Sequence, residues 1–95
     1  MTAYIILDIE VNDLVRYAEY RELATPTVAQ YGGKYIARGG KVENLEGDWS
    51  PSRIVILQFE TVEQARKWQN SPEYRPAMEL RHQTAVTRSI IVEGI

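Results

Sequence analysis

The chain has 95 residues, enough for one domain and too few for two, so we expect a single domain over residues 1–95. Its apolar fraction of 44% and charged fraction of 25% are typical of a globular protein and exclude disorder along the whole chain. The formal net charge is −2, and eleven Lys and Arg are scattered among thirteen Asp and Glu. Without a basic stripe, nucleic acid is not among the expected partners.

The absence of cysteine excludes disulfides, thiolate metal sites and a cysteine nucleophile. It suits a reducing compartment, and we expect a cytoplasmic protein. The apolar run from Tyr4 to Leu7 follows no basic residue and is interrupted by Asp8 and Glu10. This start is typical of neither a signal peptide nor a membrane span, so no membrane partner is expected.

Residues 3–11 are predicted to form a strand, because β-favouring side chains alternate between two faces. One face carries Ala3, Ile5, Leu7, Ile9 and Val11, and the other carries Tyr4, Ile6, Asp8 and Glu10. The first face has the apolar character of a core-facing surface.

A helix is predicted over residues 12–30, with Asn12 as its N-cap. Its apolar stripe consists of Leu14, Tyr17, Ala18, Arg21, Ala24, Val28 and Tyr31. Pro26 predicts a kink or a break around Thr25, because the proline ring clashes with the preceding turn. Gly32-Gly33 ends the helix, since glycine accepts left-handed C-cap geometry.

Two more strands are predicted over residues 34–38 and 53–60, joined by a turn-rich segment at 41–51. The strand at 53–60 has the continuous apolar centre of an inner strand. Thr61 and Gln64 form a capping box for a short helix that ends near residue 70.

Ser71-Pro72-Glu73 predicts the start of another helix, which runs to residue 84 and is irregular near Pro76. Residues 86–93 are the last predicted strand. The order β-α-β-β-α-β predicts an α+β, ferredoxin-like fold. In this fold a four-stranded antiparallel sheet carries both helical segments on one face.

The other face of the predicted sheet is open and carries Ile6, Ile54 and Ile56. An exposed apolar sheet favours a cover, and two such sheets can pack face to face by an isologous contact. The expected partner is therefore a second copy of the chain, in a homodimer through the sheet faces.

A set of short motifs spans nearly the whole chain. It consists of Tyr20, Tyr31-Gly32-Gly33-Lys34-Tyr35, Arg38-Gly39-Gly40, Glu46-Gly47-Asp48-Trp49, Arg53, Phe59, Ser71-Pro72-Glu73-Tyr74, Arg81 and Val92-Glu93-Gly94. In this combination the chain resembles the domain of unknown function 1330 (DUF1330) family of the dimeric α+β barrel superfamily. The resemblance implies the ferredoxin-like fold and a face-to-face dimer, with a ligand cavity between the sheet and the helices.

The resemblance implies no particular reaction. The superfamily includes cofactor-free monooxygenases, muconolactone isomerase, haem-dependent peroxidases and ligand-sensing domains. Kinship at the level of the fold does not choose among these functions.

Three arginines are candidate anion ligands. Arg38 precedes Gly39-Gly40 and either holds a carboxylate or enolate by a two-pronged contact or pins the hairpin by pairing with an acid. Arg53 is expected at the rim of the cavity, where it either binds an anion or pairs with Glu46 or Asp48. Arg81 shares an otherwise apolar helix face with Tyr74, so it needs an acid, a carbonyl or a bound anion as partner.

Tyr20 and Tyr74 are candidate hydroxyl donors to the same ligand. His82, the one histidine, is the candidate acid–base catalyst, with a surface or structural role as the alternative. Trp49 is either a dimer contact or a cavity lid. Asp8 and Glu10 either share a proton or lie solvated at an interface rim.

The leading hypothesis is a pocket between sheet and helices that binds a small anionic or polar organic molecule. An enzyme of this kind would catalyse cofactor-independent proton transfer or oxygenation. The alternative is a non-catalytic ligand sensor or structural dimer. No metal site and no cofactor are expected, because ligand spacings and phosphate loops are absent from the sequence. Haem or flavin would need a larger pocket.

Overall fold

The computed structural model describes residues 1–95 in the order β1–α1–β2–β3–α2–α3–β4. The strands are β1 (Ala3–Val11), β2 (Lys34–Arg38), β3 (Ile54–Phe59) and β4 (Ala85–Glu93). The helices are α1 (Leu14–Gln30), α2 (Val62–Gln69) and α3 (Arg75–Thr84). None of these helices combines the length and the apolar character needed to cross a bilayer.

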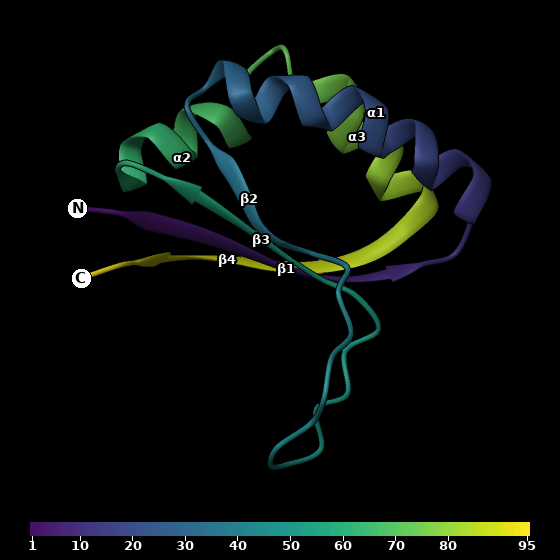
Figure 1. The fold of residues 1–95 in the computed structure, drawn as a ribbon. Coiled ribbons are helices and arrows are strands. Elements are labelled where there is room, and N and C mark those ends of the chain that lie inside the picture. The colour runs from purple at the N-terminus through teal and green to yellow at the C-terminus, as the bar shows by residue number, and fades with distance from the viewer.

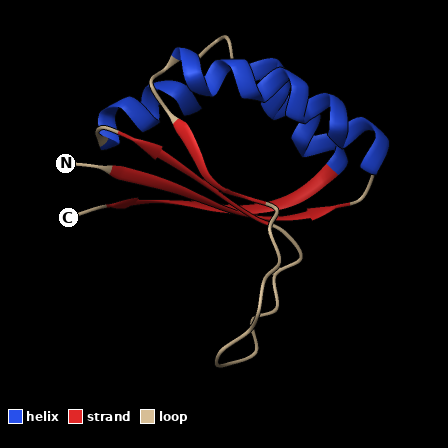
Figure 2. Cartoon of the chain, in the orientation of Figure 1, coloured by secondary structure: helices blue, strands red, loops and turns tan.

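The four strands form one antiparallel sheet in the order β2-β3-β1-β4. All three helices lie in one layer over one face of this sheet (Figure 1). Figure 2, in the same orientation but coloured by secondary structure, shows the same two layers and a long loop on the side away from the helices. The ferredoxin-like α+β prediction is confirmed, with the second helical segment divided into two helices.

The core lies between the sheet and the helix layer. On β1 the residues Ala3, Ile5, Leu7 and Ile9 are buried, as the alternation predicts. Strand β3 contributes the buried residues Val55, Leu57 and Phe59 to this core. The helical segments contribute Trp68, Tyr74 and Ala77. Trp68 stacks between two of these residues, with its ring centroid 5.7 Å from Phe59 and 4.0 Å from Tyr74.

Helix α1 differs from its prediction in three respects. Its N-cap is Asp13, whose Oδ1 accepts a hydrogen bond from the backbone N–H of Arg16 at 3.1 Å, and not Asn12. The helix continues through Pro26, which removes only the bond to the carbonyl of the exposed residue Glu22. Its buried stripe consists of Tyr17, Tyr20, Ala24, Thr27 and Val28, whereas Leu14 and Arg21 of the predicted stripe are exposed.

Helices α2 and α3 each differ from the prediction in one respect. Thr61 caps α2 as expected, but the Gln64 side chain bonds the carbonyl of Tyr31 at 2.7 Å and does not close a capping box. Ser71 instead caps an isolated turn, where its Oγ accepts from the N–H of Tyr74 at 3.1 Å. Helix α3 then begins at Arg75, so Pro76 lies in the first turn, where no backbone donor is needed.

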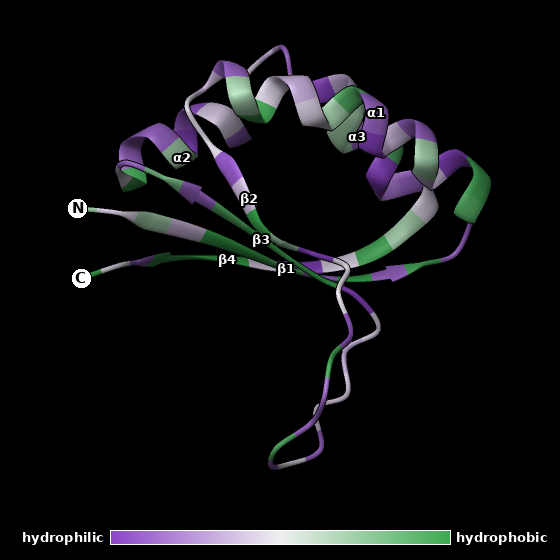
Figure 3. Cartoon of the chain, viewed as in Figure 1, coloured by the Kyte–Doolittle hydropathy of each residue, from purple (hydrophilic) through white to green (hydrophobic).

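The face of the sheet opposite the helices is open. In the strand register Ile6 of β1 lies between Ile56 of β3 and Ile90 of β4. Ile90 is 60% exposed. Hydrophobic residues follow the strands of the sheet in Figure 3. The loop between β2 and β3, residues 39–53, projects from this same side (Figure 1).

The hydroxyl of Thr27 joins α1 to α2 inside the core. It donates to the carbonyl of Ala24 at 2.7 Å and accepts from Nε1 of Trp68 at 3.0 Å. We expect Thr27→Val to lower the free energy of unfolding by about 1–3 kcal/mol, because a buried indole N–H loses its acceptor. Thr27→Ser keeps the hydroxyl and is the control, with an expected loss of about 0.8 kcal/mol for one methyl group. Equal losses for the two variants in urea titrations would contradict this role.

Candidate functional site

Three of the predicted site residues meet between α1 and α3. Tyr20 comes from α1, Tyr74 from the turn before α3, and Arg81 from the last turns of α3. The hydroxyls of Tyr20 and Tyr74 are 3.1 Å apart and hydrogen bonded, and the Arg81 Cζ lies 6.0 Å from the centroid of the Tyr20 ring. We call these three residues the inner cluster.

Arg81 is buried without a carboxylate. Its exposed fraction is 3%, and its Nε makes no hydrogen bond. The one ion pair within 4.0 Å in the structure joins Arg88 to Asp8, so no acid neutralises Arg81. Burial by itself lowers the pKa of Arg81, but the neighbouring Tyr74 and Tyr20 hydroxyls outweigh burial and the net shift is upward. The guanidinium is therefore a buried cation with donors to spare.

Tyr20 remains a neutral phenol next to this cation. Burial raises its pKa well above the ordinary value, and the adjacent Tyr74 raises it further. The nearby Arg81 opposes the shift without cancelling it. The pair of phenols can therefore donate one hydrogen bond beyond the bond that joins them.

Arg53 lies at the rim, as the strand alternation predicts. Its Cζ is 5.5 Å from the ring centroid of Tyr17, and the Tyr17 ring is 5.2 Å from the Tyr20 ring. Tyr17 thus separates Arg53 from the inner cluster. Arg53 pairs with neither Glu46 nor Asp48, so the predicted ion-pair alternative is wrong, and its buried Nε has no hydrogen-bond partner.

A cleft of about 370 Å³ opens beside Arg53 and Tyr17, and we call it the outer cleft. Its lining consists of Ile9, Glu10, Val11, Leu14, Tyr17, Arg21, Ser52 and Arg53. Arg21 was assigned no site role from the sequence. Its spacing of four residues from Tyr17 was the available signal, because residues at i and i+4 lie on the same side of a helix.

Two predicted residues lie apart from the inner cluster. Arg38 donates from Nη2 to the Thr25 hydroxyl at 2.9 Å and stacks with its Cζ 4.3 Å from the Tyr35 ring centroid. It has no carboxylate within 4.0 Å, so the predicted pairing with an acid is wrong. His82 is exposed on α3 and borders neither the inner cluster nor the outer cleft.

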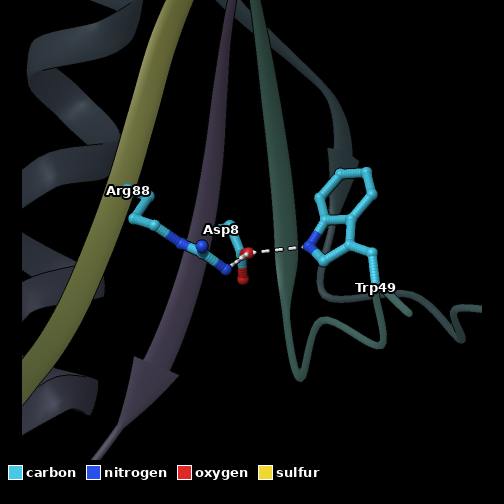
Figure 4. A network of polar contacts seen from close by, with 3 residues as sticks. All are labelled: Asp8, Trp49 and Arg88. Atoms are coloured by element: carbon cyan, nitrogen blue, oxygen red, sulfur yellow. Dashed lines mark hydrogen bonds and ion pairs between the residues drawn. The ribbon is translucent and has the colours of Figure 1, made fainter. Parts of the chain in front are cut away.

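A separate polar network lies on the open sheet face (Figure 4). Oδ2 of Asp8 accepts from Nε1 of Trp49 and from Nη2 of Arg88, both at 3.0 Å. Asp8 is therefore paired with a cation, Arg88, and makes no hydrogen bond to Glu10. Trp49 comes from the projecting loop and lies on the face away from the helices, so it is not a lid on the pocket between sheet and helices.

Comparisons with solved structures identify the fold of several other proteins as the same. A protein of unknown function from Rhodopseudomonas palustris superposes with a TM-score of 0.79 and 21% identity, over 99% of this chain and 82% of that one. SnoaB, a cofactor-independent oxygenase from Streptomyces nogalater, superposes with a TM-score of 0.72 and 10% identity, over 99% and 93% of the two chains.

A third structure, described as a dimeric protein of unknown function with a ferredoxin-like fold, comes from Bacteroides fragilis. It superposes with a TM-score of 0.67 and 12% identity, over 98% of this chain and 96% of that one. At these identities the likeness concerns the fold alone. None of the curated proteins matches the sequence.

The sequence comparison with protein families agrees with the motifs described above. The family model called domain of unknown function (DUF1330) matches residues 2–95. The matched range includes every residue of the inner cluster and the outer cleft. The chain therefore belongs to the DUF1330 family.

Proposed function

We propose that this protein binds a small anionic or polar organic molecule between the sheet and the helices. The observation that carries the proposal is the buried guanidinium of Arg81, which has no carboxylate within 4.0 Å and an unpartnered Nε. Two phenols and no carboxylate lie beside this buried charge, so an anionic ligand would supply the charged partner that the site lacks. In this proposal Arg81 and Arg53 orient the anion, and Tyr20 and Tyr74 donate hydrogen bonds.

Entry of a ligand requires Tyr17 to move, because its ring lies between Arg53 and Tyr20. Arg38 contacts α1 further along, at Thr25, and would meet only a ligand that extends along the helix. His82 can exchange protons with the site only through water or after a movement of α3, because it is exposed. In this proposal His82 acts as a proton shuttle by those routes alone.

The arrangement suits cofactor-independent chemistry. A guanidinium and two phenols beside a bound carbonyl would stabilise the enolate formed when a proton is removed. SnoaB, which shares the fold, is described as a cofactor-independent oxygenase. The competing function is a non-catalytic module, and the close packing of Trp68 on Tyr74 at 4.0 Å favours it, because the space behind the phenols is filled.

A ligand-shift melting screen against small carboxylates and quinones tests the proposal. We expect at least one compound to raise the Tm of the wild type, since a ligand at a hundred times its Kd stabilises by about 2.7 kcal/mol. Arg81→Gln removes the charge and should abolish the shift. Arg75→Gln, an exposed arginine on the same helix, is the control and should retain it. A shift that survives in Arg81→Gln would show that the compound binds away from Arg81, and no shift with any compound would favour a structural dimer without a ligand.

We also propose that two copies pair through their open sheet faces. The apolar row of Ile6, Ile56 and Ile90 supports this pairing, because a single copy leaves it uncovered. The projecting loop adds Trp49, Leu45 and Val42 as exposed apolar residues on the same side. The Bacteroides fragilis protein with this fold is described as dimeric, which is consistent with such an arrangement.

Ile90→Lys tests the pairing. The change should weaken the dimer at least about tenfold, because it places a charge in an apolar contact. Leu23→Lys makes the same change at an exposed leucine of α1 and should leave the mass unaltered. Light scattering after size exclusion measures both. A wild-type mass equal to one chain, or equal masses for wild type and Ile90→Lys, would exclude the sheet face as the contact.

A further inference from the structure

Arg21 is a third unpaired arginine on the side of α1 that faces Arg53. It lines the outer cleft together with Arg53, and it also lines the neighbouring depression that contains Arg38 and Thr25. None of these three arginines has a carboxylate within 4.0 Å, although Glu10 borders the outer cleft and Glu22 borders the depression. A row of unpaired guanidinium groups attracts anions more strongly than a row neutralised by acids.

Arg53 is held in place by its surroundings and not by an acid. Gly39 has a φ of +71°, and a Cβ built there would occupy the place of the Arg53 guanidinium, so the glycine leaves room for that group. On its other side the guanidinium lies over the Tyr17 ring, with Cζ 5.5 Å from the centroid. The Arg53 guanidinium lines the outer cleft without a carboxylate partner, so its donors on the cleft side can make a two-pronged contact with a carboxylate.

The rest of the outer cleft's lining is mostly apolar. Ile9, Val11, Leu14 and Tyr17 contribute to it, and Leu14 is 76% exposed at the mouth. An exposed leucine beside two arginines fits a ligand that has an apolar body and one anionic end. A small inorganic anion would leave this wall unused.

We propose that the outer cleft is a binding site for small organic carboxylates, with the carboxylate between Arg21 and Arg53 and the apolar body over Val11, Leu14 and Tyr17. The inference deepens the proposed function and depends on it for the anionic nature of the ligand. It adds a carboxylate position on the outer side of Tyr17 to the anion position at Arg81. Arg21 becomes a ligand-binding residue in addition to those predicted from the sequence.

Calorimetric titration with benzoate and with its uncharged analogue benzamide tests the site. Benzoate should bind the wild type, and benzamide should bind at least about tenfold more weakly, as expected for losing a charge-assisted contact. Arg21→Gln and Arg53→Gln should each weaken benzoate at least about tenfold. Arg75→Gln, at an exposed arginine outside both sites, should bind it as the wild type does. The Nε–H NMR signals of Arg21 and Arg53 should shift on addition of benzoate.

Three results would overturn the inference. Benzoate binding that is lost in Arg81→Gln but kept in Arg21→Gln and Arg53→Gln would place the anion at the inner cluster, which preserves the proposed function. Equal binding of benzoate and benzamide would show that the cleft does not recognise charge. No detectable binding of benzoate or hexanoate to the wild type would leave the outer cleft without a carboxylate site.

Gly39→Ala provides a second variant that keeps every arginine. Its Cβ must displace the Arg53 guanidinium, so benzoate should bind at least about tenfold more weakly. Gly47→Ala is the matched control, because Gly47 has a similar φ of +82° with no atom within 4 Å of the added Cβ. Both variants carry the same backbone strain. Equal benzoate affinities for the two variants would contradict the positioning of Arg53 for the ligand.

Discussion

The buried cation of Arg81 is the constraint on which the helical side of this protein depends. Helices α1 and α3 pack against each other around it, and two phenols are its nearest polar neighbours. These phenols raise the pKa of Arg81 despite its burial, but no carboxylate lies within 4.0 Å of the guanidinium. The aromatic rings of Tyr17 and Trp68 pack against Tyr20 and Tyr74 on either side of the phenol pair. A buried arginine without an acid destabilises the folded chain, and the proposed ligand gives a reason for its presence there.

The two faces of the sheet differ in chemistry because side chains alternate between them along each strand. Alternation along β1 gives one face Ile5, Leu7 and Ile9, which the helices cover, and gives the other face Ile6 and Asp8, which they do not. On the covered side, arginines and tyrosines interrupt the apolar core near the first residue of β3, which follows Arg53. On the open side, the Asp8–Arg88–Trp49 network fixes the base of the projecting loop beside the apolar row. The proposed ligand sites therefore lie on the covered side of the sheet, and the proposed dimer contact lies on its open face.

Much of the fold could be predicted because its signals are local. The period of two in β1, the threonine cap of α2 and the inner-strand character of β3 each depend on a few neighbouring residues. The wrong predictions concern features that depend on contacts between residues far apart in the chain. The backbone N–H groups of Asn12 and Asp13 both bond the carbonyl of Thr84, which moves the start of α1 by one residue.

The candidate site was likewise predictable where its signals are local, and not where it depends on contacts between distant segments. The spacing of Tyr74 and Arg81 on one helix face was visible in the sequence, and the structure buries both. The meeting of Tyr20 with Tyr74, and of Arg53 with Gly39, joins segments that are far apart in the chain. Arg21 was read as part of an apolar stripe because helical spacing does not reveal which side of α1 the sheet covers. Only the packing of α1 identifies it as a cleft residue.

The free energy of unfolding of Arg81→Met, measured beside its ligand affinity, tests the central claim most directly. If Arg81 is retained for a ligand, methionine should fill its place with a stability equal to or above that of the wild type, as replacements of buried charges by apolar groups often do. The same variant should lose the stabilisation that the ligand gives the wild type. A loss of about 3 kcal/mol or more in stability, with ligand stabilisation unchanged, would show that Arg81 serves the fold.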